Sequence, residues 1–585
     1  MENRISKYIR ILLRYGPKVS FLKLRYSIRS GFAYKKYLKE EKKREFALES
    51  FGYNPKISIL VPVYNTNAKF IISCIESVIN QIYTNWELCI VDGNSSKPYI
   101  KNILQRYTEQ DNRIKTSFLK ENKGIAGNSN EALGLATGDF VGFLDHDDEL
   151  HPCALYEVVK LLNARRDIDF VYTDEDKISA RGKRFAPHFK PDWAPDTFRS
   201  YNYICHLTVT RKSVIDATGG LRTEYEGSQD YDLFLRVSEK TERIAHIPKV
   251  LYHWRAHEYS VASDARTKMY AYESAKKALS DHIRRLGLKG EVHFARSLGR
   301  YRIRYDIDNE SAVSIIIPTR DNPEILKRCV NSVLNKSTYA HYEILIVDNK
   351  NTEEETSNFY RILSNNPRIK ILNYDKSFNF SAINNYAVSM TDSEYLIFLN
   401  NDTEVISPSW IESMLEFAQR DEVGVVGAKL YYPNNTIQHA GIIIQDRGIP
   451  RHAFRNSQKK QAGYMSRAEI IQNYSAVTGA CMMTKKCIFD EIGGFDEDFA
   501  FNFNDVDFCL NVRQKDYLIV WTPYAELYHH ESKTRGNETL MIKKERYEKE
   551  LALFRNKWKN FFESGDPYYN PNLSSRKVDF SFNIK

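Results

Sequence analysis

The chain has 585 residues, room for roughly three or four domains, and its 42% apolar and 13% aromatic content is typical of globular domains and not of a disordered chain. The net charge of +9 is concentrated at one end: residues 1–45 hold 14 Lys and Arg against 4 Asp and Glu, which leaves 70 against 71 for the rest. No run approaches about 18 apolar residues and no C-x-x-C pair occurs among the eight cysteines, so we expect no membrane-spanning helix and reduced, structural thiols.

A basic amphipathic helix is predicted near the N-terminus. Apolar side chains recur at helical spacing from Ile5 to Leu13 with basic residues between them, and Gly16-Pro17 ends the pattern. Such a helix can lie on an anionic membrane surface, which we favour, or pack on the body of the protein; nucleic-acid contact is the weakest alternative. Charges interrupt the apolar run and no cleavage site follows, so a signal peptide is not indicated. We therefore expect a cytoplasmic protein, peripheral at the inner face of the cell membrane.

The body of the chain contains the same pattern twice. Residues 57–65 read ISILVPVYN and residues 313–321 read VSIIIPTRD. LCIVD ends at Asp92 and ILIVD ends at Asp348, 256 positions later, and Asp147 precedes its counterpart Asp402 by 255 positions. A spacing that constant indicates two copies of one domain, each with a site of its own.

Each copy alternates between strand and helix patterns. Short apolar, β-branched runs at 57–63 and 313–318 are typical of buried parallel strands, and helical patterns follow at 68–81 and 323–334. We therefore predict an α/β fold, with a mostly parallel sheet covered by helices on both faces. Ligands of such sheets bind at the carboxyl ends of the strands, so the polar residues there are the candidate site residues.

The pattern divides the chain into five segments. They are a basic amphipathic helical segment (1–50), a first catalytic domain (51–261), a helical connector (262–311) whose clearest helix covers 270–286, a second catalytic domain (312–536), and a C-terminal helix and tail (537–585) with a polar helix over 537–562.

Acidic residues recur at corresponding places in the two copies. DHDD at 145–148 and NND at 400–402 each follow an apolar strand, and QD at 229–230 and ND at 504–505 each open an amphipathic helix. Histidines close the copies, and clustered carboxylates with an occasional imidazole suit Mg²⁺ or Mn²⁺. The alternative is that these residues form turns and helix caps, and we interpret Asp232 and Asp507 in that way.

With these motifs the chain resembles the inverting family 2 glycosyltransferases, which have the Rossmann-like GT-A fold. The PVYN and PTRD openings, DHD and NND, and the QD and ND helix starts carry the resemblance over about 57–260 and 313–535. DEDKI at 174–178, LYHWR at 251–255 and DPYYNPNL at 566–573 make it most similar to two-domain enzymes of bacterial O-antigen or rhamnose-rich surface polysaccharides.

The resemblance implies a role for each candidate residue. Asp230 and Asp505 would be the general bases. The metal ligands would be Asp147, His253, Asp402 and either His529 or His530, of which alignment with His253 favours His529. The residues that would bind the donor are Pro62, Tyr64, Asp92, Asn128, Asp145, Thr319, Asp348, Asn384 and Asn400, with Asp92 and Asp348 at the base and Asp145 and Asn400 at the ribose or diphosphate. Asn400 departs from the family pattern because it replaces an aspartate.

The favoured hypothesis is a bifunctional, metal-dependent glycosyltransferase. It would take UDP-, GDP- or dTDP-sugars and extend a lipid-linked glycan at the membrane, without binding nucleic acid. One alternative is a single active domain whose partner binds the acceptor, and another is a non-catalytic nucleotide-binding scaffold. A nucleotidyltransferase would normally show a Gly-rich phosphate loop, and neither GxGxxG nor a P-loop occurs.

Overall fold

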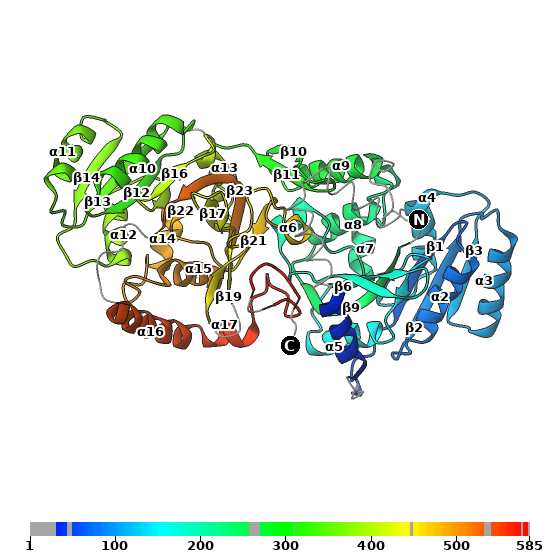
Figure 1. The fold of residues 1–585 in the computed structure, drawn as a ribbon. Coiled ribbons are helices and arrows are strands. Elements are labelled where there is room, and N and C mark those ends of the chain that lie inside the picture. Colours follow the sequence, from blue (N-terminus) through cyan, green and yellow to red (C-terminus); the bar gives the residue numbers. More distant parts are fainter. Residues whose placement is uncertain are drawn as a thin grey trace.

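The computed structural model describes residues 31–43, 49–256, 269–308, 310–444, 448–531, 540–574 and 577–582. Two α/β lobes lie side by side, with a connector above their junction and the C-terminal segment below it (Figure 1). We call the lobe that contains β1 to β9 the first lobe and the lobe that contains β12 to β23 the second lobe. The basic helix predicted near residues 5–13 lies outside the described residues.

The first lobe is built around a nine-stranded sheet. Its strands are β1 (Ile57–Val63), β2 (Trp86–Asp92), β3 (Ile114–Phe118), β4 (Phe140–Phe143), β5 (Glu149–Leu150), β6 (Phe170–Ser179), β7 (Arg184–His188), β8 (Thr208–Arg211) and β9 (Ile244–Ala256). Its helices are α2 (Ala68–Ile79), α3 (Pro98–Gln110), α4 (Gly124–Leu135), α5 (Ala154–Ala164), α6 (Pro195–Ser200), α7 (Lys212–Thr218) and α8 (Gln229–Ser238).

The second lobe repeats this plan around a ten-stranded sheet, with a two-stranded hairpin beside it. Its strands are β12 (Val313–Thr319), β13 (Tyr342–Asp348), β14 (Ile369–Asn373), β15 (Tyr395–Leu399), β16 (Thr403–Val405), β17 (Val423–Tyr431), β18 (Ile437–His439), β19 (Ile442–Ile444), β20 (Pro450–His452), β21 (Gln472–Asn473), β22 (Cys481–Lys485) and β23 (Leu518–His529). Its helices are α10 (Pro323–Lys336), α11 (Glu354–Leu363), α12 (Phe380–Val388), α13 (Trp410–Ala418), α14 (Lys486–Ile492) and α15 (Asn504–Gln514).

The two main sheets have the same strand order. It is β3-β2-β1-β4-β8-β6-β9-β5 in the first lobe and β14-β13-β12-β15-β22-β17-β23-β16 in the second, which confirms the predicted α/β fold and its duplication. Most of the paired residues in both sheets lie in parallel pairs, as predicted, but the sheets are mixed, because β8 and β22 run antiparallel to both of their neighbours. Periodicity identifies a buried strand but does not give its direction, so the reversal was not visible in the sequence.

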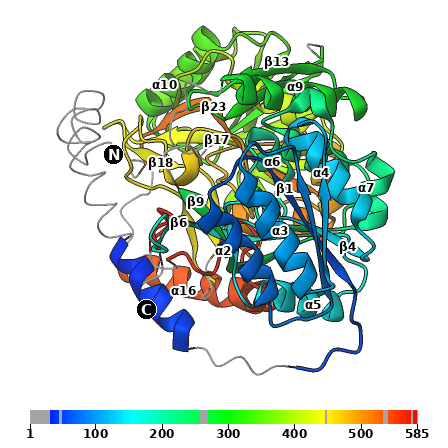
Figure 2. The ribbon, with the colours of Figure 1, turned by 90° about the vertical axis from the view of Figure 1, so that its right-hand side faces the viewer.

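Helices cover both faces of each sheet. In the first lobe α2, α3 and α5 pack on one face, and Figure 2 shows α2 and α3 side by side there. The α2 sequence explains its place, because Ile71, Cys74, Ile75 and Val78 recur at helical spacing and are all buried. Its first turn is capped by Asn67, whose side chain accepts a hydrogen bond from the Lys69 amide at 2.9 Å.

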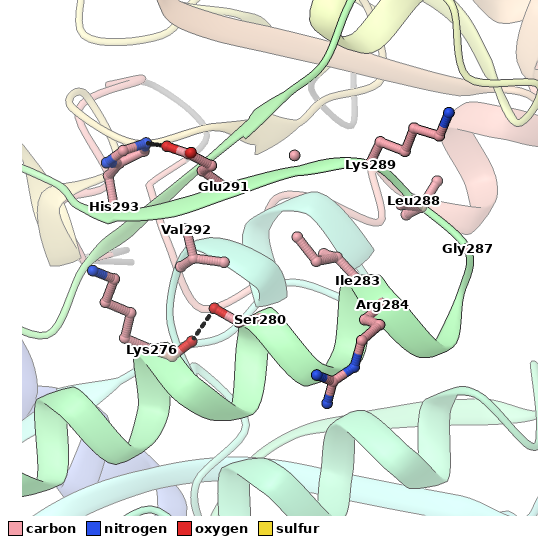
Figure 3. Close-up of a pocket in the computed structure, with 11 residues that line it drawn as sticks. Lys276, Ser280, Ile283, Arg284, Gly287, Leu288, Lys289, Glu291, Val292 and His293 are labelled. Atoms are coloured by element: carbon pink, nitrogen blue, oxygen red, sulfur yellow. Dashed lines mark hydrogen bonds and ion pairs between the residues drawn. The ribbon is translucent and has the colours of Figure 1, made fainter.

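The connector is only half helical, which corrects the prediction. It consists of α9 (Met269–Arg285) and a hairpin of β10 (Gly290–Phe294) and β11 (Tyr301–Tyr305). The sequence YRIRY at 301–305 alternates polar and apolar residues and buries Tyr301, Ile303 and Tyr305 on one face, the pattern of a strand. An open cavity of about 650 Å³ lies between α9 and the hairpin, and Figure 3 shows that its lining includes Lys276 and Arg284 and none of the predicted site residues.

The C-terminal segment joins the lobes. After α16 (Leu540–Lys557) and α17 (Lys559–Ser564), the Asp566 carboxylate accepts hydrogen bonds from the Ile444 amide at 2.8 Å and the Ser475 hydroxyl at 2.7 Å, both in the second lobe. Four residues later the Asn570 side chain donates to the buried Asp174 carboxylate of the first lobe at 2.9 Å. The DPYYNPNL sequence therefore bridges the two lobes through buried polar contacts.

We expect Asn570→Ala to destabilise the protein by about 1–3 kcal/mol, because the buried Asp174 carboxylate loses a donor that water cannot replace. Urea unfolding measures the loss. Asn560→Ala, an exposed amide on α17, is the matched control and should change the free energy of unfolding by less than about 0.5 kcal/mol. Equal effects of the two substitutions would contradict a bridging role for Asn570.

No helix among the described residues combines the length and the apolar character that a membrane crossing requires. This finding agrees with the sequence expectation for that part of the chain.

Candidate active sites at corresponding strand ends

The nucleotide-side candidates lie at the carboxyl ends of the first strands of each sheet. Asp92 ends β2 and Asp348 ends β13, and both are buried. The Ser95 amide donates to Asp92 at 3.3 Å, whereas Asp348 accepts hydrogen bonds from the Tyr360 hydroxyl at 2.9 Å and from the Asn351 amide. Burial raises the pKa of Asp348, although the Tyr360 hydrogen bond opposes the shift.

The remaining donor-side candidates differ between the lobes. Pro62 lies within β1 and the Tyr64 ring beyond it is 46% exposed. Thr319 is buried and its hydroxyl accepts a hydrogen bond from Asn401 at 2.9 Å, which ties the end of β12 to the NND turn. This contact brings Thr319 to the NND turn, which carries Asn400 and Asp402.

Two buried asparagines stand on the helices that follow β3 and β14. In the first lobe, the Asn128 side chain donates to the Asn122 side chain at 2.9 Å and accepts from the Lys123 amide at 3.2 Å. In the second lobe, Asn384 donates to the Phe380 carbonyl at 2.7 Å, and its Oδ1 is buried with no hydrogen-bond partner among the described residues. A buried acceptor without a partner is costly, so Asn384 is the better placed of the two to meet a ligand donor.

In the second lobe an imidazole and a carboxylate meet at the NND turn. His529, the last residue of β23, places its Nε2 3.1 Å from Asp402 Oδ1 and 3.3 Å from Asn400 Nδ2. Burial would raise the pKa of Asp402, but the hydrogen bond from His529 lowers it below its usual range. The neighbouring His530 contacts Glu404 instead, at 3.4 Å, so the structure brings His529 and not His530 to Asp402.

This pair fits a divalent cation. Two ligands at right angles on an ion with bonds of about 2.1 Å lie about 3 Å apart, close to the His529–Asp402 separation of 3.1 Å. A carboxylate oxygen and an imidazole nitrogen are also ligands that Mn²⁺ accepts.

The first lobe does not place His253 in the corresponding position. Strand pairing aligns Glu149 with His253 and Glu404 with Tyr528, so the residue that matches His529 is Trp254. Successive residues of a strand face opposite sides of the sheet. His253 accordingly points to the other face of β9, where its Nδ1 lies 2.6 Å from the fully buried Asp176.

Another histidine, His206, faces the first lobe's acidic turn. It precedes β8, its Nε2 lies 3.7 Å from Asp145 Oδ2, and its ring stacks on Tyr252 with centroids 4.6 Å apart. Burial would lower the pKa of His206, but the neighbouring Glu175 and Asp145 carboxylates raise it to about 9. His206 was not predicted, because the repeated motifs place a histidine only at the end of each copy. On the turn itself, the Asp147 Oδ1 lies 3.9 Å from the Nδ1 of the neighbouring His146.

The proposed bases occupy the same position in each lobe. Asp230 is the second residue of α8 and accepts from the Asn202 side chain at 3.0 Å; Asp505 is the second residue of α15 and accepts from the Gly479 amide at 2.9 Å. Burial raises the pKa of both carboxyl groups above the usual aspartate range, although the positive charge of His206 opposes the shift at Asp230. Each is therefore a better proton acceptor than an ordinary aspartate.

The aspartates two positions later are structural, as the sequence indicated, although they pair with basic and indole side chains and do not cap the helices as predicted. Asp232 is fully buried and pairs with Arg236 at 2.7 Å and with Arg222, which links α8 to the preceding loop. Asp507 accepts a hydrogen bond from the Trp558 indole at 2.8 Å, which anchors the C-terminal helices to the second lobe.

One further group of potential ligands is a poor metal site. The ligand atoms of Glu175, Cys205 and His206 lie within 4.8 Å of one another. However, the buried Lys190 ammonium already neutralises Glu175 at 3.2 Å, and burial raises the pKa of the Cys205 thiol well above its usual value. These contacts indicate a network that holds His206 in place.

A family sequence pattern, curated relatives and a solved structure are similar to this chain. The sequence pattern described as glycosyl transferase family 2 matches residues 58–219 and 314–493, one stretch in each lobe and together more than half of the chain. The chain is 42% identical to "Uncharacterized protein y4gI" of Sinorhizobium fredii (strain NBRC 101917 / NGR234), over 90% of this chain and 58% of that one. It is 38% identical to "O-antigen biosynthesis protein RfbC" of Myxococcus xanthus, over 91% of this chain and 41% of that one, so it spans about half the length of these curated relatives. Among solved structures it is similar to the mannosyltransferase PcManGT from Pyrobaculum calidifontis in complex with GDP-Man and Mn²⁺, at 17% identity and a TM-score of 0.32, over 44% of this chain and 72% of that one.

Proposed function

Because this chain belongs to glycosyl transferase family 2, we propose that each of its lobes transfers a sugar from a nucleotide-sugar donor to a growing bacterial surface polysaccharide, with inversion at the anomeric carbon. The observation that carries the proposal is the double occurrence of one arrangement. Each lobe sets a half-buried aspartate with a raised pKa at the start of a helix, Asp230 or Asp505, and an acidic turn with a facing imidazole at strand ends.

The chemistry follows from these positions. The Asp230 or Asp505 carboxylate takes the proton of an acceptor hydroxyl while the hydroxyl oxygen forms a bond to the anomeric carbon of the donor sugar. The bond from that carbon to the diphosphate breaks on the opposite side, and its electron pair leaves with the nucleoside diphosphate. Attack opposite the leaving group inverts the anomeric centre.

A divalent cation would be held in the second lobe by Asp402 and His529, and in the first lobe by Asp147 with its neighbours on the acidic turn. When bound, it offsets the negative charge that develops on the departing diphosphate. Asp92 and Asp348 would bind the nucleotide base, and Asp145 and Asn400 would face the ribose or diphosphate.

The name of the Myxococcus relative, an O-antigen biosynthesis protein, supports a surface polysaccharide as the product. The basic N-terminal segment supports a lipid-linked acceptor at the inner membrane face, because Lys and Arg clusters attract anionic lipid. The donors of the two lobes would be UDP-, GDP- or dTDP-sugars.

A donor panel tests the proposal. The full chain is incubated with Mn²⁺ or Mg²⁺ and UDP-, GDP- or dTDP-sugars, with lipid-linked oligosaccharide from bacterial membranes as acceptor, and products are weighed by mass spectrometry. We expect metal-dependent release of nucleoside diphosphate and mass increments equal to sugar residues. If no donor turns over but a nucleotide still binds, the chain is a nucleotide-binding scaffold.

The pH dependence of transfer follows from the raised pKa values of the bases. A general base must be deprotonated, so the transfer rate should fall on acidification at a pH above about 3.9, the ordinary aspartate value. Rates measured from pH 4 to 8, with circular dichroism at each pH to exclude unfolding, provide the check. An acid limb that persists unchanged in the residual activity of Asp230→Asn and Asp505→Asn would assign the titration to another group.

A further inference from the structure

The His206 ring is held between two carboxylates. Its Nε2 lies 3.7 Å from Asp145, on the acidic turn, and its Nδ1 lies 3.5 Å from Glu175, on β6. Tyr252 stacks against one face of the ring, and Trp254 lies at its side with centroids 6.0 Å apart. These contacts fix the ring so that Nε2 is the nitrogen nearest to the acidic turn.

The strand pairings show that His206 has no counterpart histidine in the second lobe. Phe140 pairs with Arg211 in the first lobe, and its counterpart Tyr395 pairs with Lys485 in the second, so Arg211 corresponds to Lys485. Five residues before each of these, just ahead of the strand, His206 corresponds to Ala480. The second lobe instead has His529 where the first lobe has Trp254. Each lobe therefore brings an imidazole from outside the turn to its acidic turn, from just before β8 in the first lobe and from the end of β23 in the second.

We propose that His206 is the imidazole ligand of the first lobe's divalent cation, with Asp145 as the carboxylate next to it. The inference rests on the proposed metal-dependent function. Histidines that bind metals commonly direct the other ring nitrogen to a carboxylate, and Glu175 is the carboxylate on that side of His206, with its Oε2 3.5 Å from Nδ1, an ion-pair distance without hydrogen-bond geometry. His253 is a structural residue in this assignment, because its ring faces Asp176 on the opposite side of β9.

Electron spin resonance with Mn²⁺ as the probe tests the assignment. The free Mn²⁺ signal gives the number and affinity of sites in the full chain, with UDP, GDP or dTDP present, and spin-echo modulation detects coordinated nitrogen. In the His529→Ala variant, the second lobe's imidazole is absent, so any nitrogen coordinated to Mn²⁺ must come from another residue. The variants compared in that background are His206→Ala, His206→Gln and the matched control His253→Ala, each checked by its thermal unfolding midpoint.

We expect the His529→Ala protein to keep nitrogen coordination at one site and His253→Ala to leave it unchanged. His206→Ala and His206→Gln should both abolish it and weaken the remaining Mn²⁺ site about tenfold or more. Glu175→Gln, as a positioning change, should keep the nitrogen signal while weakening Mn²⁺ affinity about tenfold. Nitrogen coordination that survives His206 replacement overturns the assignment, and its loss with His253→Ala would return the ligand role to His253. A wild-type protein that binds no Mn²⁺ with any of the three nucleotides would overturn the metal-dependent function itself, a separate result.

Discussion

Asp505→Asn should abolish the sugar addition made by the second lobe, lowering its rate by about 10²- to 10⁴-fold, while the first lobe continues to work. The substitution keeps the size and polarity of the side chain. One oxygen of Asp505 accepts from the Gly479 amide and the other from the Val506 amide, both at 2.9 Å, and an asparagine side chain can accept only one of these hydrogen bonds. It therefore removes one local hydrogen bond together with the capacity to take a proton. The loss should therefore appear in the maximal rate, with little change in donor affinity.

The reciprocal variant makes the result specific. Asp230→Asn should remove the other addition, so that each variant stalls the product at a different mass. Asp498→Asn, an exposed aspartate in the loop ahead of α15, is the matched control and should leave both additions unchanged. If only one of the two base variants changes the products, the chain has a single working site instead of the two proposed.

Much of the fold could be predicted from the sequence because buried apolar side chains recur with the period of a helix or form the continuous run of a buried strand. The β1 and β12 runs are largely apolar because helices cover both sheet faces, and the helix patterns that follow them were located to within two residues at each end. The antiparallel direction of β8 and β22 could not be predicted, because a buried antiparallel strand has the same composition as a parallel one. The β10–β11 hairpin was hidden by its place after a long helix.

The candidate sites show a sharper limit. Strand-end aspartates such as Asp348 and Asp402 were predictable because the residue after a buried run lies at the sheet's carboxyl edge. Whether a histidine reaches that edge depends on strand register, and one residue of register turns a side chain to the opposite face. His253 and Trp254 differ by that single step. His206 arrives from a separate strand, so no local motif contained it.

Arg420→Met should destabilise the protein by about 3–5 kcal/mol, because it leaves a buried carboxylate at the junction of the lobes without its main counter-charge. Arg420, which follows α13, contacts Asp196 of α6 at 2.5 Å, and the two side chains are 3% and 1% exposed. Asn473 of β21 donates to the other carboxylate oxygen at 2.9 Å. The positive charge of Arg420 keeps the pKa of Asp196 low despite burial, so the carboxylate stays ionised when the arginine is present.

A double variant distinguishes the cause of this loss. If the uncompensated charge is responsible, the double variant Arg420→Met with Asp196→Asn should be more stable than Arg420→Met alone. The Asp196→Asn change removes the buried negative charge that Arg420→Met leaves without a partner. Lys212→Met, which breaks the more exposed pair with Asp216, is the control and should cost at most about 1 kcal/mol. The measurement is the free energy of the first transition in urea unfolding, because separation of the two lobes would occur in that transition. A double variant no more stable than Arg420→Met would show that packing of the arginine side chain, and not its charge, holds the two lobes together.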